Sequence, residues 1–347
     1  MRAGGGASPA EGARFALCLI LSLAVLAALV AASFLVGPYA ISPGDVARVL
    51  AAALVGKASG LAPNVDAVVL ELRAPRIAAA IAVGASLAAS GAAYQRLFRN
   101  PLVSPDILGV SAGSAVGAAL ALLGTLPASA IQVAAFAGGL AAVTMVVALA
   151  SALGGRDRML TLVLTGVVVG SLFGAGVALL KALADPASQL PALTFWLMGS
   201  FAAVTPHDLA GALVPMVAGI AALWLLRWRI DVLTLSPAEA ASLGVPAAAL
   251  RWAVIVAATL ATAASVALAG TIGWVGLVVP HAARLLAGAA FARVLPLSLL
   301  TGAALMVAID TACRVAFGAE MPPGVLTAFV GTPLFIALLA LAVRRSP

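Results

Sequence analysis

The amino-acid sequence predicts an all-α integral membrane protein with about ten transmembrane helices. Hydrophobic residues make up 64% of the 347 residues and charged residues only 9%. A soluble domain carries about 25% charged residues, so most of this chain is expected to face lipid or other helices. Apolar runs long enough to cross a bilayer alternate with short segments rich in Gly, Pro and charge. The 34 glycines are typical of membrane helices that approach one another closely.

The N-terminal region is expected to divide into a tail and a first span. Residues 1–14 are predicted to form a disordered cytoplasmic tail, and residues 15–347 a single polytopic domain. The run from Phe15 to Val36 is too long for a signal-peptide core and lacks a convincing cleavage site, so we expect it to be retained. The eighth expected span is short, which leaves open a tilted, broken or partly re-entrant segment. The expected spans are 15–36, 75–97, 105–124, 130–152, 159–182, 206–227, 250–270, 274–288, 295–316 and 323–343.

The distribution of basic residues predicts the orientation. An even number of spans places both termini on one side. With that side cytoplasmic, thirteen of the nineteen basic residues lie inside and six outside, as the positive-inside rule expects. The net charge of +7 therefore favours orientation in a membrane over nucleic-acid binding. The six external residues are Arg48, Lys57, Arg73, Arg76, Lys181 and Arg314.

A polar, proline-containing segment, residues 95–109, joins the second and third expected spans. Pro101 and Pro105 restrict its backbone. Ser104, Pro105 and Asp106 have the residue types typical of the N-cap, N1 and N2 positions, so the third helix is predicted to begin there.

A second polar segment, residues 228–250, is predicted to carry a short cytoplasmic helix over 237–243. Ser236 and Glu239 have capping-box spacing, and Pro237 occupies the first helical position. Gly244 follows Leu243 and can end the helix in the left-handed conformation. A helix this short needs a neighbour for stability, which favours a docking element over a plain connector.

Glycine spacing leaves two interpretations open. One helix carries Gly109, Gly113 and Gly117, and another carries Gly166, Gly170 and Gly174. Each set lies on one helix face and permits close packing. The alternative is that one such face borders a substrate path.

Several enzymatic and carrier functions lack their sequence signatures. Neither Lys57 nor Lys181 lies in a phosphate-binding loop, no serine lies in a G-x-S-x-G motif, and no metal-ligand spacing is present. Cys18 and Cys313 both fall within expected spans, so no disulfide is expected. Asp310 is the one carboxylate near a plausible intramembrane position, and it lies four residues before Arg314, with which it can pair. This argues against an ion-coupled carrier.

Five ordered sequence blocks resemble the permease subunits of ATP-driven iron-chelate, haem and cobalamin importers, the FecCD-type (type II) family. The resemblance covers approximately residues 37–343. The blocks are Leu72-Arg73-Ala74-Pro75-Arg76; Asn100-Pro101-Leu102 through Gly109-Val110-Ser111; Trp196-Leu197-Met198-Gly199-Ser200; Gly270-Thr271 through Trp274 to Pro280-His281; and Pro322-Pro323-Gly324-Val325 through Gly331-Thr332-Pro333-Leu334-Phe335. Trp274 and Pro322 depart from the residues usual in the family.

The resemblance implies a type II ABC importer permease fold and a set of partners. These are a second copy of the chain, two cytoplasmic ATPase subunits and a periplasmic substrate-binding protein, assembled in a bacterial inner membrane. ATP would be used by the ATPase subunits, and this chain would carry no catalytic residue, metal or permanently bound cofactor.

The resemblance also assigns residues to three roles. The coupling region, about 231–250, would contact the ATPase subunits through Ser236, Pro237, Glu239, Leu243 and Gly244. Docking of the binding protein would use Arg73, Arg76 and Arg314; the alternative is snorkelling, or pairing with Glu71 and Asp310. The translocation path would include Thr165, Gly166, Gly170, Gly174, Lys181, Trp196 and Met198.

The cargo expected from the family is haem, a ferric siderophore or cobalamin. The fifth expected span is mainly Leu, Val, Gly and Ala, with Thr161, Thr165, Ser171 and Lys181 as its polar residues. An apolar conduit slightly favours haem, the most apolar of these cargoes.

Overall fold

The computed structural model describes residues 9–154, 157–235, 237–315 and 321–345. These residues form helices and connecting loops, with no β-strand among them. The helices run in the order α1 (Pro9–Leu35), α2 (Pro43–Leu54), α3 (Pro63–Ala67), the π-helical segment η1 (Val68–Arg73), α4 (Ala74–Leu97), the 3-10 turn η2 (Pro105–Leu108), α5 (Val110–Leu123), α6 (Ala128–Leu153), α7 (Arg158–Leu183), α8 (Gln189–Met198), α9 (Pro206–Ile230), the 3-10 turn η3 (Asp231–Thr234), α10 (Pro237–Ser242), α11 (Ala247–Ala269), α12 (Val275–Ala287), α13 (Phe291–Val315) and α14 (Pro323–Arg345).

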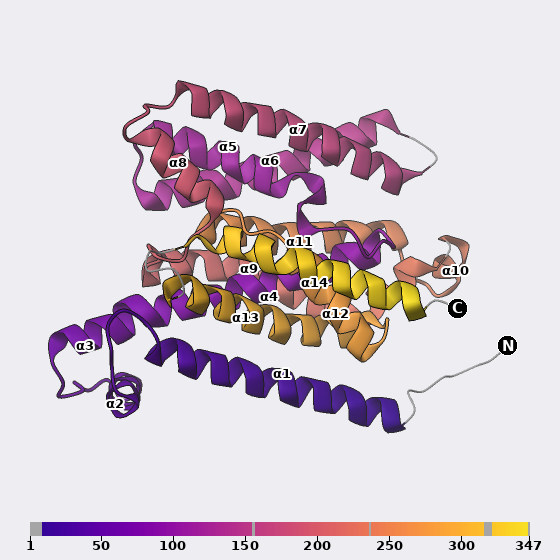
Figure 1. Cartoon of the computed structure of the whole chain (residues 1–347). Helices are drawn as coiled ribbons and strands as arrows, with labels where there is room; N and C mark the ends of the chain where they lie inside the picture. The colour runs from indigo at the N-terminus through magenta and orange to yellow at the C-terminus, as the bar shows by residue number, and fades with distance from the viewer. Residues whose placement is uncertain (1–8, 155–156, 236, 316–320, 346–347) are drawn as a thin grey trace.

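The long helices lie roughly side by side in one bundle (Figure 1). Seven described helical segments are long and apolar enough to cross a membrane, and three shorter apolar helices, Val110–Leu123, Val275–Ala287 and Pro323–Leu338, lie among them. Together they match the ten expected spans, and the chain is a multi-pass membrane protein. The first helix differs in its start, because it begins at Pro9 within the predicted tail.

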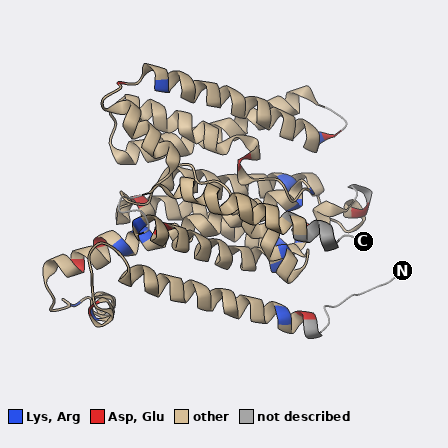
Figure 2. Cartoon of the chain, viewed as in Figure 1, with Lys and Arg blue, Asp and Glu red and all other residues tan. Residues whose placement is uncertain are grey.

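The two ends of the bundle are distinct. One end carries α2, α3 and α8, and the other carries α10, the start of α1 and the end of α14 (Figure 1). We call these the α2 end and the α10 end. Charged residues gather near both, and the helices between them are largely uncharged (Figure 2). This is the distribution that a bilayer imposes, because a charge at its centre is costly.

Helix α4 forms the centre of the bundle and packs against α9, α11, α12 and α13. Its glycines allow this close packing. A Cβ on Gly91 would lie 1.8 Å from the carbonyl oxygen of Gly276 on α12, and one on Gly84 would lie 2.3 Å from that of Gly302 on α13. No side chain fits in these spaces, so the two contacts specify glycine.

Helices α5, α6 and α7 form a second group beside this core (Figure 1). Gly113 and Gly117 face Gly138 and Ala134 on α6, where an added Cβ would come within 2.4 Å and 2.0 Å of the respective carbonyl oxygens. The face formed by Gly113 and Gly117 therefore packs inside the subunit. Of the two interpretations left open by the glycine spacing, close helix packing is the correct one for this helix.

The predicted start of the third span is wrong by five residues. Pro105 to Leu108 form the separate turn η2, and Gly109 (φ +74°) divides it from α5. Ser104 forms no side-chain cap there. The carboxylate of Asp106 instead accepts a hydrogen bond from the N–H of Ser111 at 2.7 Å. Gly109, in the left-handed conformation, changes the direction of the chain before α5 begins. Residue preferences at helix starts did not predict this break.

Candidate functional site

Helix α7 presents a continuous apolar face that no other part of the described chain covers. Its side chains are more than half exposed along the whole length of the helix. The members of this exposed α7 face are Leu160, Leu164, Val167, Val168, Leu172, Leu179 and Leu183. A face of this kind contacts either lipid or a second protein surface.

The opposite face of α7 packs inside the subunit and contains three of the predicted path residues. Thr165 is buried and its hydroxyl donates to the carbonyl of Thr161 at 2.7 Å. A Cβ on Gly166 would lie 2.3 Å from the carbonyl oxygen of Ile107. Gly170 is close to Gly109 in the same contact. Thr165 and Gly166 thus lie on the packed side of α7 within one subunit, and their assignment to the path stays a prediction that this packing disfavours.

Gly174 and Lys181, the other two predicted path residues on α7, lie outside this packed contact. Gly174 is exposed, and an added Cβ would meet no atom within 4 Å. Lys181, in the last turn of α7, is half-buried near the α2 end. Of the predicted path residues on α7, these two remain accessible to a partner or a cargo.

Helix α8 is held against α11 and α14 by its backbone. The hydroxyl of Thr271 donates to the carbonyl of Leu197. The carbonyl oxygens of Trp196 and Met198 lie so close to Gly270 and Gly324 that a Cβ there would approach within 2.2 Å and 2.3 Å. Trp196 and Met198 are thus fixed at the α2 end by residues from three separate sequence blocks.

A cavity of about 320 Å³ lies beside α8 at this end. Its lining comes from α6, α8, α9 and α11 and includes Phe195, Trp196, Gln132 and Asp208. The side-chain amide of Gln132 donates to the carbonyl of Asp208 at 3.0 Å, which closes one wall. Trp196 therefore borders open space, as its assignment to the path requires, but the side chain is half-buried.

The first polar segment, residues 95–109, holds the start of the coupling region in place. Arg99 donates to the carbonyls of Leu233 and Leu235 at 3.0 and 2.7 Å. Asp231 forms an ion pair with Arg96 at 2.6 Å and accepts the N–H of Phe291 at 3.1 Å. These contacts join the end of α4, the turn η3 and the start of α13, so they fix the base from which α10 projects.

Helix α10 covers Pro237–Ser242, as the capping pattern predicted to within one residue. Gly244 has φ +68° and ends it in the left-handed conformation. Glu239 and Leu243 are exposed, while Ala240 is buried against the bundle. Ser236 lies outside the described residues. The helix stands at the edge of the α10 end with few contacts to its own subunit (Figure 1).

Of the three arginines assigned to docking, Arg73 is buried and Arg76 and Arg314 are largely buried. Arg73 donates to the carbonyls of Phe34 and Tyr39. Arg76 contacts Asp310 through Nη2 at 2.8 Å, and its Nε donates to the same carboxylate at 2.9 Å. Arg314 lies 3.4 Å from the other oxygen of Asp310 and also donates to the carbonyl of Ser33 at 3.2 Å.

Little of this group reaches the surface. The side chains of Arg76, Arg314 and Asp310 are 12%, 7% and 1% exposed. The docking assignment stays a prediction that these contacts disfavour, because all three guanidinium groups are bound to carboxylate or carbonyl oxygens of their own subunit. Pairing with Asp310, the alternative considered from the sequence, is confirmed for Arg76 and Arg314.

Two other basic residues at the α2 end are exposed. Arg48 lies on α2, and Lys57 follows that helix. Val46 and Val49 on the same helix are buried against Val69, so α2 is anchored by one face and presents the other. The signal in the sequence was the amphipathic pattern of 43–54, in which Arg48 falls away from the apolar positions Val46 and Val49.

A scan against family models matches residues 24–341 to the FecCD transport family. The chain belongs to this family. The molybdate import system permease protein MolB of Haemophilus influenzae is 39% identical over 306 residues, 88% of this chain and 89% of that protein. A probable iron chelatin transport system permease protein of Helicobacter pylori is 38% identical over 276 residues, 80% of this chain and 83% of that protein.

Two further comparisons agree with membership of the FecCD family. The cobalamin import system permease protein BtuC of Halobacterium salinarum is 41% identical over 283 residues, 81% of this chain and 75% of that protein. A solved metal-chelate type ABC transporter in an inward-facing conformation superposes with a TM-score of 0.83, at 36% identity over 93% of this chain and 98% of that one. The protein is thus an ABC transporter permease, and the resemblance read from five sequence blocks is confirmed.

Within the FecCD fold, four of the five blocks contact one another. The block at 196–200 meets those beginning at Gly270 and Pro322 at the end of α8. The block beginning at Asn100 meets Gly276, where an added Cβ would lie 2.3 Å from the ring of Pro105. Trp274, the departure noted in the sequence, takes φ +68° and packs against Gly331 and Phe335.

Proposed function

We propose that this FecCD permease is the translocation subunit of an ATP-driven importer in a bacterial inner membrane. The observation that carries the proposal is the exposed α7 face, an apolar surface on a helix whose opposite side packs against η2. In the proposed assembly two copies bring their α7 faces to a shared axis, and the cargo passes between them. Both termini and α10 face the cytoplasm.

The two ends of the bundle then have separate partners. Two ATPase subunits bind at α10, which is short, exposed and held on the rigid base of Arg96, Arg99 and Asp231. A periplasmic binding protein docks at the α2 end. ATP is used by the ATPase subunits, and the permease holds no permanent cofactor.

The proposed cargo is a metal chelate, with haem the first to test. The exposed α7 face is apolar, which suits a large apolar cargo that must not bind tightly in transit. Relatives named for molybdate, iron chelate and cobalamin import define the competing cargoes. Molybdate was not among those considered from the sequence. It is a small anion, and the cations of α7 are confined to its two ends, Arg158 in the first turn and Lys181 in the last.

The test is uptake by the complete complex. The permease, its ATPase subunits and its binding protein are reconstituted in liposomes, and ATP-dependent uptake is measured for haem, a ferric siderophore, cobalamin and molybdate in parallel. We expect uptake of haem that requires ATP and the binding protein. If another cargo is taken up and haem is not, the importer proposal stands and the haem assignment is overturned. If none of the four compounds shows ATP-dependent uptake, the importer proposal itself is overturned.

An ion-coupled secondary carrier is the alternative from another class. Such a carrier needs a membrane-embedded carboxylate available for an ion. Asp310 is engaged by Arg76 and Arg314, which argues against that role. Gradient-driven uptake by the permease alone, without ATPase subunits, would favour the carrier.

A further inference from the structure

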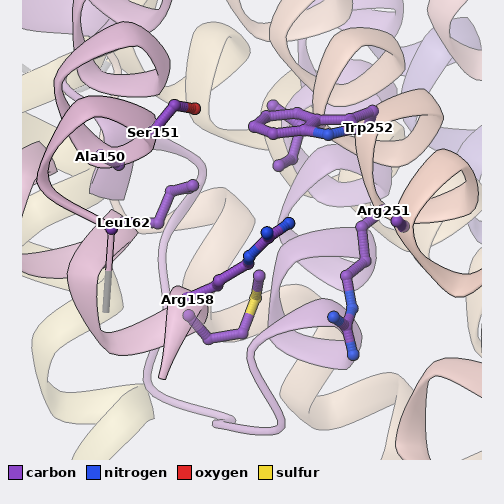
Figure 3. Close-up of a pocket in the computed structure, with 10 residues that line it drawn as sticks. Ala150, Ser151, Arg158, Leu162, Arg251 and Trp252 are labelled. Carbon is purple, nitrogen blue, oxygen red and sulfur yellow. The ribbon is translucent and has the colours of Figure 1, made fainter. Parts of the chain in front are cut away.

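A small cavity opens at the α10 end between α6, α7 and α11, next to the C-terminal limit of the coupling region at Ala248. Its volume is about 150 Å³. In Figure 3, Arg158 extends from the start of α7 towards Trp252, and Arg251 lies on the other side of the same space. Ser151 on α6 completes the polar part of the lining. None of the described residues that line the cavity is acidic.

The two guanidinium groups bring uncompensated positive charge to this cavity. Within the described part of the chain, neither Arg158 nor Arg251 has a hydrogen-bond or ion-pair partner. The nearby carboxylate of Asp157 instead accepts the backbone N–H groups of Met159 and Leu160, at 3.0 and 3.2 Å. Two cations that line one cavity repel each other, and an anion between them would remove that repulsion.

The positions of these arginines on their helices add to the argument. Arg158 is the first residue of α7, and Arg251 lies five residues into α11. A positive charge near a helix N-terminus opposes the helix dipole. An anion bound here would be favoured by both side chains and by the two helix ends.

The surroundings of the cavity are those of a membrane interface. Leu149 and Leu153 lie one turn apart on α6, Val256 lies one turn beyond Trp252 on α11, and all three are exposed. Trp252 is itself 37% exposed, and tryptophan is enriched where headgroups meet acyl chains. An occupant with an anionic head and an apolar tail would satisfy both the guanidinium groups and these exposed side chains.

We propose that the cavity between α6, α7 and α11 binds the phosphodiester headgroup of an anionic phospholipid. Arg158 and Arg251 contact the phosphate, Trp252 packs at the glycerol level, and the acyl chains lie along Leu149, Leu153 and Val256. Basic pockets between transmembrane helices on the cytoplasmic side are suited to such headgroups. Bound there, the lipid would tie the first turn of α7 to α6 and α11. The inference does not depend on the cargo.

The test is retention of lipid by the purified full-length permease, measured by native mass spectrometry after exchange into detergent. Phosphatidylglycerol and phosphatidylethanolamine are added at equal concentrations. We expect selective retention of phosphatidylglycerol, with each guanidinium contributing a factor of about five to its affinity. The double variant Arg158→Gln/Arg251→Gln should lose the selectivity, and Trp252→Ala should weaken binding of both lipids.

Arg229→Gln is the matched control, because it removes one exposed charge from the end of α9, outside this cavity. It should leave retention unchanged. Equal loss in this control would overturn the site, since it would indicate a general charge effect. Equal retention of the two lipids by the unmodified permease would also overturn it.

A second measurement does not depend on the variants folding well. The unmodified permease is photo-crosslinked with a phosphatidylglycerol carrying a reactive group near its headgroup, and labelled peptides are identified. We expect labels within 150–162 and 248–255. Thermal protection by inorganic phosphate equal to that by dioctanoyl phosphatidylglycerol, without labelling of these segments, would identify a free-anion site and overturn the lipid assignment.

Discussion

Asp310 illustrates at the scale of single residues how charge is kept inside a membrane protein. Its carboxylate is enclosed by Arg76 and Arg314, which come from α4 and α13, and Arg314 also reaches the backbone of α1. The group therefore joins three helices at the α2 end. Removing one member of a buried ion pair leaves the others uncompensated, which costs more than the pair itself contributes.

The first prediction is that Asp310→Ala destabilises the permease by about 3–5 kcal/mol. The reason is that two nearly buried guanidinium groups lose their carboxylate. Thermal unfolding of the purified protein in nanodiscs measures the effect. Glu71→Ala is the control, because Glu71 is exposed on neighbouring η1 and should change stability little. Unfolding of Asp310→Ala at the temperature of the unmodified protein would contradict the structural role.

The second prediction compares two glycines. Gly91→Ala places a methyl group against the carbonyl oxygen of Gly276 and should cost about 1–3 kcal/mol or prevent folding, because the backbones must separate. Gly174→Ala meets open space within the subunit and should be tolerated or slightly stabilising. Expression level and thermal unfolding distinguish the pair. Equal behaviour of the two variants would contradict the packing described for α4 and α12.

At the scale of elements, α2 and α10 resemble each other in being short helices that stand at opposite ends of the bundle (Figure 1). Each is anchored by a few buried side chains, Val46 and Val49 for α2 and Ala240 for α10. Because a helix of six residues such as α10 is not stable alone, its ends must be held by specific residues.

The third prediction concerns the end of α10. Gly244→Ala forces a side chain into the left-handed conformation at φ +68°, at a cost of about 1–2 kcal/mol, and should displace the helix end. We expect normal insertion with reduced ATPase binding or uncoupled transport. Gly211→Ala, inside α9 with no atom within 4 Å, is the matched control and should behave as the unmodified protein. Full coupled transport by Gly244→Ala would remove α10 from the proposed coupling role.

The fourth prediction replaces the docking residues inferred from sequence. Arg48 and Lys57 are exposed at the α2 end, whereas Arg73 is buried and Arg76 and Arg314 are largely buried. Changing Arg48 and Lys57 to Glu should slow association of the binding protein and reduce its dependence on ionic strength, since exposed charges act mainly on encounter rate. Surface-plasmon measurements at several salt concentrations test this. Arg229→Glu, at the other end, should have no effect. Unchanged association kinetics for the double variant would remove these two residues from docking.

At the scale of the whole molecule, the described bundle has a closed core around α4, and α7 is among the outer helices that expose an apolar face. The same helix contributes its buried side to η2 and its first residue to the cavity with Arg251. A movement of α7 would therefore change both the proposed subunit interface and the proposed lipid site.

The fifth prediction tests the proposed dimer axis. In a background without Cys18 and Cys313, single cysteines on the exposed α7 face, for example at Leu164, Val168 and Leu172, should crosslink between copies. Cysteines at Thr165 and Gly166 should not, because those positions pack inside the subunit. Crosslinked dimers are read on denaturing gels with and without nucleotide. A pattern without the helical period of the exposed face would place the subunit contact elsewhere.

The amino-acid sequence by itself determined the membrane class, the ten spans, the short helix at 237–242 and the family. These properties depend on local hydropathy, on capping residues a few positions apart and on ordered motifs, all of which are visible along the chain. It also identified Asp310 and Arg314 as a possible pair, since they lie one helical turn apart.

Only the tertiary structure decided which charges are buried and which helix face is open. Arg73 and Arg76 find their partners 39 and 234 residues away, at Phe34 and Asp310, so no local pattern distinguishes them from the exposed Arg48. Helix α7 is apolar on every side, so its sequence has no polar stripe to mark the packed face. In lipid both faces of a helix are equally apolar, and the choice between them is made by close contacts such as that of Gly166 with Ile107.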